Sequence, residues 1–100
     1  MPINRVEFHN DAGAEYDAAF DWYLEHSNDA ALDFDREVHR ALADIASAPH
    51  RWAAAQFSAR RYLLRGFPYI LIYRDWEGHI QIVAVAHTSR KPGYWEKRVK

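Results

Sequence analysis

At 100 residues, the chain is expected to form one domain spanning residues 1–100, with room for one core but not for a separate cofactor domain. Its formal net charge is −1, 49% of its residues are hydrophobic, and it has no cysteine, which excludes disulfides, thiolate zinc sites and thiol nucleophiles. No apolar run reaches the length of a membrane span and the first residues do not resemble a signal peptide, so we expect a cytoplasmic protein.

The first half of the sequence predicts a short strand followed by two helices. Residues 6–9 alternate between apolar and polar side chains, which is typical of a strand. Asn10 or Asp11 is expected to cap the first helix, and Asn28 or Asp29 the second. Because the polar break between them is so short, the two helices are expected to lie side by side as an antiparallel hairpin. The apolar residues that mark the two helix faces are Tyr16, Ala19, Phe20 and Tyr23, then Phe34, Val38, Ala41, Leu42 and Ile45.

The second half predicts three strands. Residues 62–64 form a short apolar run, and the turn residues 65–68 lead into a β-branched and aromatic strand at 69–73. A second turn at 75–78 leads into a buried strand at 80–86. The expected order is therefore β-α-α-β-β-β. This is an α+β domain in which an antiparallel meander sheet is covered by the two-helix hairpin.

Several kinds of catalytic or cofactor site are not supported by the sequence. Asp35 and His39 lie one helical turn apart, but no third metal ligand occurs at a recognisable spacing, so no metal site is expected. The four scattered glycines form no phosphate-binding loop, and we expect no cofactor. Ser89 is too close in sequence to His87 to indicate a nucleophile–base pair.

Charge is distributed unevenly along the chain. Residues 1–50 carry three Arg and no Lys against eleven Asp and Glu, whereas residues 51–100 carry ten Lys and Arg against three acids. This asymmetry favours a basic face that binds an anionic partner, either a nucleic acid or an acidic protein. Ion pairs between the acidic and the basic half would instead leave a surface of mixed charge. The candidate target-binding residues flank the predicted strands and follow the last one: Arg60, Arg61, Arg65, Arg74, His87, Arg90, Lys91, Tyr94 and Trp95.

This basic and aromatic set fits two kinds of activity. Arg offers paired donors to phosphate or carboxylate, while Tyr, Trp and His can stack on bases or fill pockets at a protein interface. In a nuclease that needs no metal, His would act as acid or base and Arg would stabilise the pentavalent phosphate. The residue types alone leave both activities open.

Five segments occur in an order and at a spacing that are together fairly specific: Trp22-Tyr23, Ala41-Leu42-Ala43-Asp44-Ile45, Pro49, residues 67–74 (FPYILIYR) and residues 85–90 (VAHTSR). Through them the chain resembles, over nearly its whole length, the RelE/ParE superfamily of toxins from bacterial type II toxin–antitoxin pairs. The β-α-α-β-β-β order matches that family's fold. The resemblance implies a small cytoplasmic growth inhibitor that is held inactive by a cognate antitoxin protein, with no role for a membrane.

The superfamily divides by target. One branch cuts messenger RNA on the ribosome with basic side chains on the meander and a tyrosine in the C-terminal tail, whereas the ParE-like branch inhibits DNA gyrase. When the chain is aligned on the strand ending at Tyr73, the basic positions of the cutting branch fall on Arg61, Leu63 and Ile70. Because two of these three are apolar, the resemblance favours a ParE-like gyrase inhibitor.

Two alternatives stay open. The first is a ribosome-dependent, metal-independent endoribonuclease, for which the resemblance leaves Arg61, His87, Arg90 and Tyr94 as weak catalytic candidates. The second is a relic that binds its antitoxin and is not toxic. In every case we expect a toxin–antitoxin hetero-oligomer, with an antitoxin that is acidic where it meets the Arg-rich strands and apolar where it meets the helices.

The C-terminal tail carries a prediction of its own. Pro92 and Gly93 are expected to end regular structure after the last strand, so Tyr94 and Trp95 must either pack on the domain or project from it. Charged residues surround the two rings, which favours a solvent-exposed surface that contacts the target. A chain truncated after Arg90 should then stay folded and lose toxicity.

Overall fold

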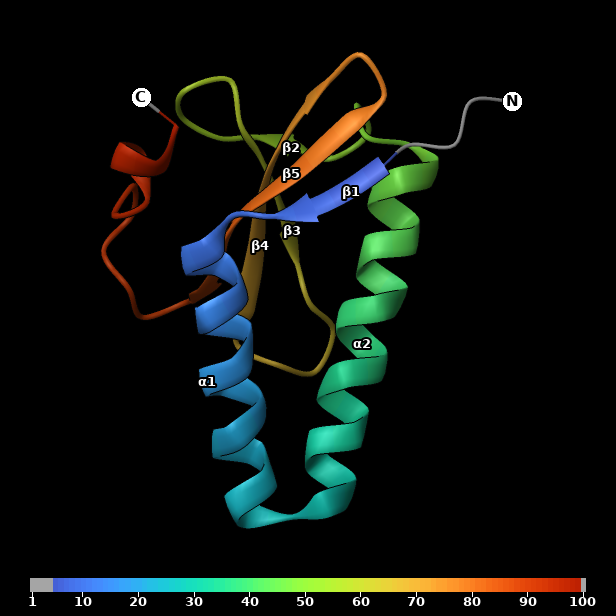
Figure 1. Cartoon of the computed structure of the whole chain (residues 1–100), viewed down its shortest axis with the longest axis vertical. Coiled ribbons are helices and arrows are strands. Elements are labelled where there is room, and N and C mark those ends of the chain that lie inside the picture. Colours follow the sequence, from blue (N-terminus) through green and yellow to red (C-terminus); the bar gives the residue numbers. More distant parts are fainter. Residues whose placement is uncertain (1–4, 100) are drawn as a thin grey trace.

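A computed structural model describes residues 5–99 of the protein. Figure 1 shows a long pair of helices that lies against a twisted sheet and extends beyond it at one end, with the C-terminal tail lying beside the start of the first helix. The elements in chain order are β1 (Arg5–Phe8), α1 (Asn10–His26), α2 (Asn28–Ser47), β2 (Ala53–Ala54), β3 (Arg60–Leu63), β4 (Tyr69–Trp76), β5 (His79–His87) and a short 3₁₀ helix (Glu96–Arg98).

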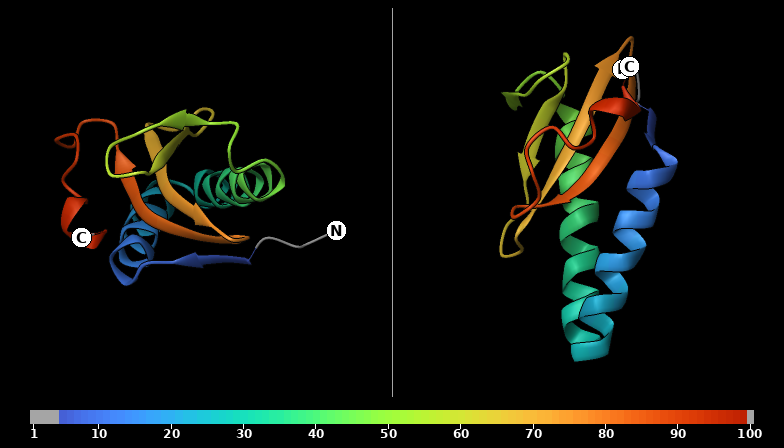
Figure 2. Two further views of the ribbon diagram at one scale, coloured as in Figure 1. Left: turned by 90° about the horizontal axis from the view of Figure 1, so that it is seen from above. Right: turned by 90° about the vertical axis from the view of Figure 1, so that its left-hand side faces the viewer.

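The predicted helical hairpin is present, with α1 and α2 packed side by side in both views of Figure 2. Both helices begin one residue earlier than expected. His9 caps α1, with its Nδ1 atom accepting the backbone N–H of Asp11 at 3.0 Å, and Ser27 caps α2, with its hydroxyl accepting the N–H of Ala30 at 3.2 Å. The expected caps Asn10 and Asn28 are the first residues of the helices themselves. A capping residue has non-helical backbone geometry, so neither can be the cap.

The five strands form one sheet in the order β1-β5-β4-β3-β2. Strands β2 to β5 pair antiparallel, as the meander prediction requires, but β1 pairs in parallel with β5. The sheet is therefore mixed, and the expectation of a purely antiparallel sheet is wrong at this edge. The two helices bring the chain back to the end of the sheet where β1 begins: His50, which follows α2, lies 3.2 Å from Asp75 of β4, close to the Arg5–His79 end of the β1–β5 pair. From that end β3 and β5 can both run parallel to β1. Strand β2 is an addition to the predicted order.

Two apolar layers cover the two faces of the sheet. The first lies between the sheet and the helices, where Phe34, Val38 and Ile45 of α2 pack against Leu71 and Tyr73 of β4. On the opposite face, Trp95 packs with Ala59, Ile72, Val83 and Ala84. The C-terminal tail thus folds back over part of the sheet face that the helices leave uncovered.

The expectation that both tail rings face solvent is wrong. Trp95 is 4% exposed, and Tyr94 is half-buried beside the same apolar layer. The physical reason is that β4 and β5 turn small and branched side chains, among them Ile72, Val83 and Ala84, toward the face opposite the helices. Covering them with an indole ring removes apolar surface from water on both partners. Direct contact of Trp95 with a target would require this packing to open.

Candidate functional site

The candidate site is a groove of about 550 Å³ between the end of the meander and the returning tail. Ile70 and Ile72 of β4 and Ala86 of β5 give it apolar surface. Arg61 of β3 and the loop that follows β5 line its sides, including Arg90 and Lys91. We refer to this feature as the basic groove.

The basic groove continues into an adjoining groove of similar volume on the outer side of β3. The two share Arg61, Ile70 and Thr88, and the adjoining groove adds Arg65 and the highly exposed Leu63. Among the residues that the structure describes, no Asp or Glu lines either groove. Cations without neighbouring carboxylates produce a positive potential, which attracts an anionic partner.

The structure brings together most of the predicted target-binding residues. Those that line the basic groove are Arg61, His87, Arg90, Lys91, Tyr94 and Trp95, and Arg65 lines the adjoining groove.

Arg60 and Arg74 are not among the residues that line either groove. The guanidinium of Arg60 donates to the backbone carbonyl oxygen of Trp52 at 2.8 Å. Arg74 lies over the ring of Trp76, 5.3 Å from the ring centroid, next to the β4–β5 turn and at the opposite end of β4 from Tyr69. These two arginines therefore make local structural contacts and do not line the grooves with the other predicted target-binding residues.

Glu15 of α1 holds the tail that closes one side of the basic groove. Its carboxylate accepts the Tyr94 hydroxyl at 2.7 Å, both terminal nitrogens of Arg98 at 2.8 and 3.0 Å, and the backbone N–H of Val85 at 3.0 Å. Arg98 also donates to the carbonyl oxygen of Val83 at 3.0 Å. The Glu15 side chain is 17% exposed and that of Arg98 is 14% exposed, so this is a largely desolvated cluster.

The electrostatics of this cluster follow from its hydrogen bonds. Burial by itself raises the pKa of Glu15, but the hydrogen bonds from Arg98, Tyr94 and the Val85 amide outweigh it, so the pKa lies below its ordinary value. Burial, together with the hydrogen bond to Glu15, strongly raises the pKa of Tyr94. Tyr94 therefore remains a neutral phenol whose proton is donated to Glu15.

His87 is also engaged locally. Its Nδ1 atom accepts the backbone N–H of Ser89 at 3.0 Å and lies 2.7 Å from the Ser89 hydroxyl. With Nδ1 as the acceptor, the neutral ring carries its proton on Nε2. The structure thus places a histidine, an arginine and a tyrosine at one groove, but the tyrosine hydroxyl is directed to Glu15.

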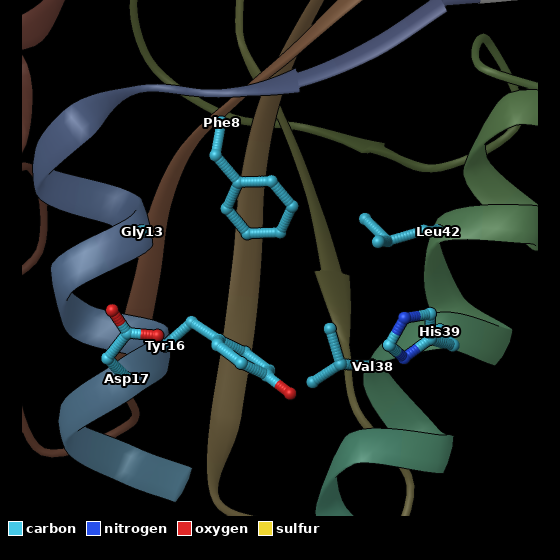
Figure 3. Close-up of a pocket in the computed structure, with 7 residues that line it drawn as sticks. All are labelled: Phe8, Gly13, Tyr16, Asp17, Val38, His39 and Leu42. Atoms are coloured by element: carbon cyan, nitrogen blue, oxygen red, sulfur yellow. The ribbon is translucent and has the colours of Figure 1, made fainter.

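A second, smaller cavity of about 240 Å³ lies between the helices beneath β1 (Figure 3). Phe8, Val38 and Leu42 make it largely apolar, while Asp17 and His39 are polar groups in its lining. It also includes Tyr16, whose hydroxyl donates to Asp35. This cavity is suited to an apolar side chain of a protein partner, because its polar groups are few and its walls are preformed.

Glu15 and Arg98 are not among the functional residues expected from the sequence, which holds little sign of their contact. Acidic residues on an amphipathic helix usually face solvent, and 83 residues separate Glu15 from Arg98. The one available signal is compositional: the tail adds Arg98 to a segment of aromatic residues, and a buried arginine needs a carboxylate partner.

Comparison with known proteins identifies the family. The model of a family described as the ParE toxin of the type II toxin–antitoxin system, parDE, matches residues 6–92. The chain belongs to this ParE toxin family. The resemblance to the RelE/ParE superfamily is thereby confirmed, and the protein is a member of a toxin family of type II toxin–antitoxin systems.

The fold agrees with this assignment to the ParE toxin family. A solved structure of the chromosomal ParDE toxin–antitoxin system from P. aeruginosa is similar with a TM-score of 0.73 and 18% sequence identity, covering 87% of this chain and 98% of the other. No curated protein matches the sequence significantly. Within residues 5–99, neither helix combines the length and the apolar character needed to cross a membrane.

Proposed function

We propose that the protein is the toxin of a type II toxin–antitoxin pair, that it acts in the cytoplasm by binding and inhibiting DNA gyrase, and that a cognate antitoxin neutralises it. The observation that carries the proposal is the match to the ParE toxin family over residues 6–92. The side-chain geometry supports action by binding: Leu63 and Ile70 are apolar where the cutting branch is expected to be basic, and the Tyr94 hydroxyl is bonded to Glu15.

The basic groove is the proposed binding surface. Arg61, Arg90 and Lys91 line it without a carboxylate among the described residues, and Ile70 and Ile72 supply apolar area beneath them. A partner segment with acidic side chains and one or two apolar residues would be complementary in charge and polarity. Apolar area contributes affinity, and the cations raise the rate of association.

The proposed antitoxin would cover two chemically different surfaces. Helices α1 and α2 carry ten Asp and Glu against two Arg, while the opposite face of the sheet carries the basic groove. An acidic segment would neutralise the groove, and an apolar segment would meet the helices at the cavity lined by Phe8 and Leu42. The resulting complex would be a toxin–antitoxin hetero-oligomer.

An in vitro supercoiling assay tests the gyrase target. Purified toxin is added to gyrase and relaxed plasmid, and the control is the same toxin mixed beforehand with its antitoxin. The proposal expects loss of supercoiling or accumulation of cleaved plasmid with free toxin and normal supercoiling with the complex. Normal gyrase activity at a large molar excess of free toxin would contradict it.

A ribosome-dependent endoribonuclease is the second candidate, because His87, Arg90 and Tyr94 all line one groove. In that case induced expression should produce new messenger RNA ends in primer extension without DNA damage signalling, whereas gyrase inhibition should produce the opposite pattern. Absence of growth inhibition on induction would favour the third reading, a relic that only binds its antitoxin.

A further inference from the structure

We propose that Glu15 is a positioning residue for the target-binding groove: it fixes the C-terminal tail so that Arg90 is held at the groove. The inference rests on the proposed function, since it concerns how the proposed binding surface is formed. It assigns to an acidic residue on helix α1, outside the groove, a part in recognition of an anionic partner.

The contacts form a continuous path from Glu15 to the groove. Glu15 accepts the Tyr94 hydroxyl at 2.7 Å, and the guanidinium of Arg90 lies over the Tyr94 ring with its central carbon 3.8 Å from the centroid. Arg98, which is bonded to Glu15, lies 5.2 Å from the centroid of the same ring. The Tyr94 ring therefore contacts two arginines, and Glu15 fixes both the ring and one of them.

The loop that carries Arg90 and Lys91 has few other supports. Residues 88–92 are exposed, and Gly93, which follows them, has φ +79°, a left-handed conformation that glycine adopts readily. Within the described residues, one backbone hydrogen bond joins this loop to a distant segment, from the Thr88 N–H to the carbonyl oxygen of Pro68 at 2.9 Å; the bonds around Arg90 are short-range, such as Arg90 N–H to the carbonyl of His87 at 3.0 Å. The position of Arg90 over Tyr94 thus depends on where the tail is anchored.

Glu15 is well suited to be that anchor. Its two carboxylate oxygens receive hydrogen bonds from three different places: the tail tyrosine, the tail arginine and the backbone of β5. A carboxylate that is largely buried is costly unless such donors are present, so the arrangement persists as a unit. Losing the charge on Glu15 weakens the hydrogen bonds that hold Tyr94 and Arg98, whereas the apolar packing of Trp95 does not depend on that charge.

The test compares Glu15→Gln with Asp11→Asn. Both changes remove one negative charge from the same end of α1, and both residues approach Arg98. Asp11, however, is 63% exposed and lies 3.6 Å from Arg98 Nε, so it makes only a weak contact. The first readout is the ring-current shift of the Arg90 side-chain protons caused by the Tyr94 ring, measured by NMR on the full-length chain. The second is the toxin level that gives half-maximal growth inhibition on induced expression.

We expect Glu15→Gln to abolish most of the Arg90 ring-current shift and to raise the required toxin level roughly tenfold, the scale of losing a hydrogen bond to a charged group. Asp11→Asn should keep the ring-current shift and the required toxin level of the wild type. A Glu15→Gln chain that keeps the ring-current shift, or that loses it while remaining as toxic as the wild type, overturns the proposal.

A further variant guards against loss of folding. If Glu15→Gln does not fold, Tyr94→Phe replaces it, because this change keeps the ring and removes only the hydrogen bond to Glu15. A smaller loss of both readouts supports the proposal, and unchanged readouts overturn it. If the wild-type chain does not inhibit growth, the proposed function fails, and the NMR measurement alone still decides whether Glu15 positions Arg90.

Discussion

Glu37 of α2 accepts the backbone N–H of Arg65 at 2.7 Å and so joins the helix to the loop between β3 and β4. The Glu37 side chain is 11% exposed and is also paired with Arg40 at 2.7 Å. Glu15 of α1 makes a corresponding contact with the backbone N–H of Val85 in β5. Each helix thus contributes one carboxylate that holds a segment next to the proposed binding grooves.

Replacing Glu37 by alanine should destabilise the protein. The change leaves the Arg65 amide without its acceptor, which should lower the free energy of unfolding by about 1.5–3 kcal/mol, as for other hydrogen bonds to charged groups. Urea unfolding measures the difference. The control is Asp33→Ala, which removes an exposed helix carboxylate paired with Arg36 at 3.5 Å and should change stability by much less. Equal effects of the two changes would contradict the assigned role of Glu37.

Truncation after Arg90 should now unfold or strongly destabilise the chain, contrary to the expectation from the sequence. Trp95 is 4% exposed against Ile72 and Val83, and loss of such a ring typically costs about 3–5 kcal/mol. The milder change Trp95→Ala tests the same point by thermal unfolding. Trp76→Ala is the control, because Trp76 is 44% exposed and its removal should cost much less. A truncated chain with an unchanged unfolding temperature would contradict this packing.

Charge at the basic groove should control the rate of complex formation. Arg61→Gln and Lys91→Gln are each expected to slow association with the cognate antitoxin by roughly threefold to tenfold at low salt, with a smaller effect at high salt. Arg74→Gln, which removes the same charge outside the groove, should have little effect. Stopped-flow or surface-binding kinetics at two salt concentrations provides the measurement. If all three changes slowed association equally, the rate would depend on the net charge of the protein and not on the charges at the groove.

The sequence predicted the local features of the fold better than the distant ones. The helical hairpin and strands β3 to β5 follow from periodicity and turn residues, which act over short stretches of chain. The parallel pairing of β1 with β5 joins residues more than 70 positions apart, such as Val6 and Ile80, and periodicity carries no information on such a partner. Strand β2 consists of Ala53 and Ala54, which have no strand signal of their own.

In the candidate site, too, the local features were predictable from the sequence and the distant contacts were not. Arg61, Arg90 and Lys91 were predicted because charge and strand ends are visible in the sequence, and the structure places them along one groove. The burial of Trp95 could not be predicted, because the charges around the tail rings favour solvent exposure unless a distant partner such as Glu15 pairs with Arg98. Once Glu15 neutralises Arg98, the neighbouring Trp95 can be buried without exposing an unpaired cation to the apolar layer.

Gly13 in α1 offers a stabilising change. A Cβ atom built at Gly13 meets no other atom within 4 Å, and the residue lies in the helix beside the cavity of Figure 3. Gly13→Ala should therefore raise the free energy of unfolding by about 0.5–1 kcal/mol through helix propensity. Gly66 also has open space around it, but its φ of +78° disfavours any side chain, so Gly66→Ala should be destabilising. Calorimetry should show a higher unfolding temperature than the wild type for Gly13→Ala and a lower one for Gly66→Ala. A shift in the same direction for both variants would contradict the assigned backbone conformations.

The stabilising contribution of Glu15 should disappear in acid. Its pKa is held below the ordinary value of 4.5 by hydrogen bonds from Arg98, Tyr94 and Val85 that outweigh the opposing effect of burial. A carboxyl group whose pKa is lower in the folded state contributes stability that is present above the unfolded-state pKa. That contribution is lost as the pH falls from about 4.5 through the lowered folded-state pKa.

The measurement is the difference in unfolding free energy between the wild type and Glu15→Gln, taken at about pH 7 and again at about pH 3. Taking the difference cancels the protonation of the other carboxylates, which are common to both chains. We expect the wild type to be clearly more stable at neutral pH and the difference to shrink as Glu15 is protonated, because a neutral carboxyl group loses its charge-assisted bonds to Arg98. A difference that is the same at both pH values would show that the ionised form of Glu15 is not what holds the tail.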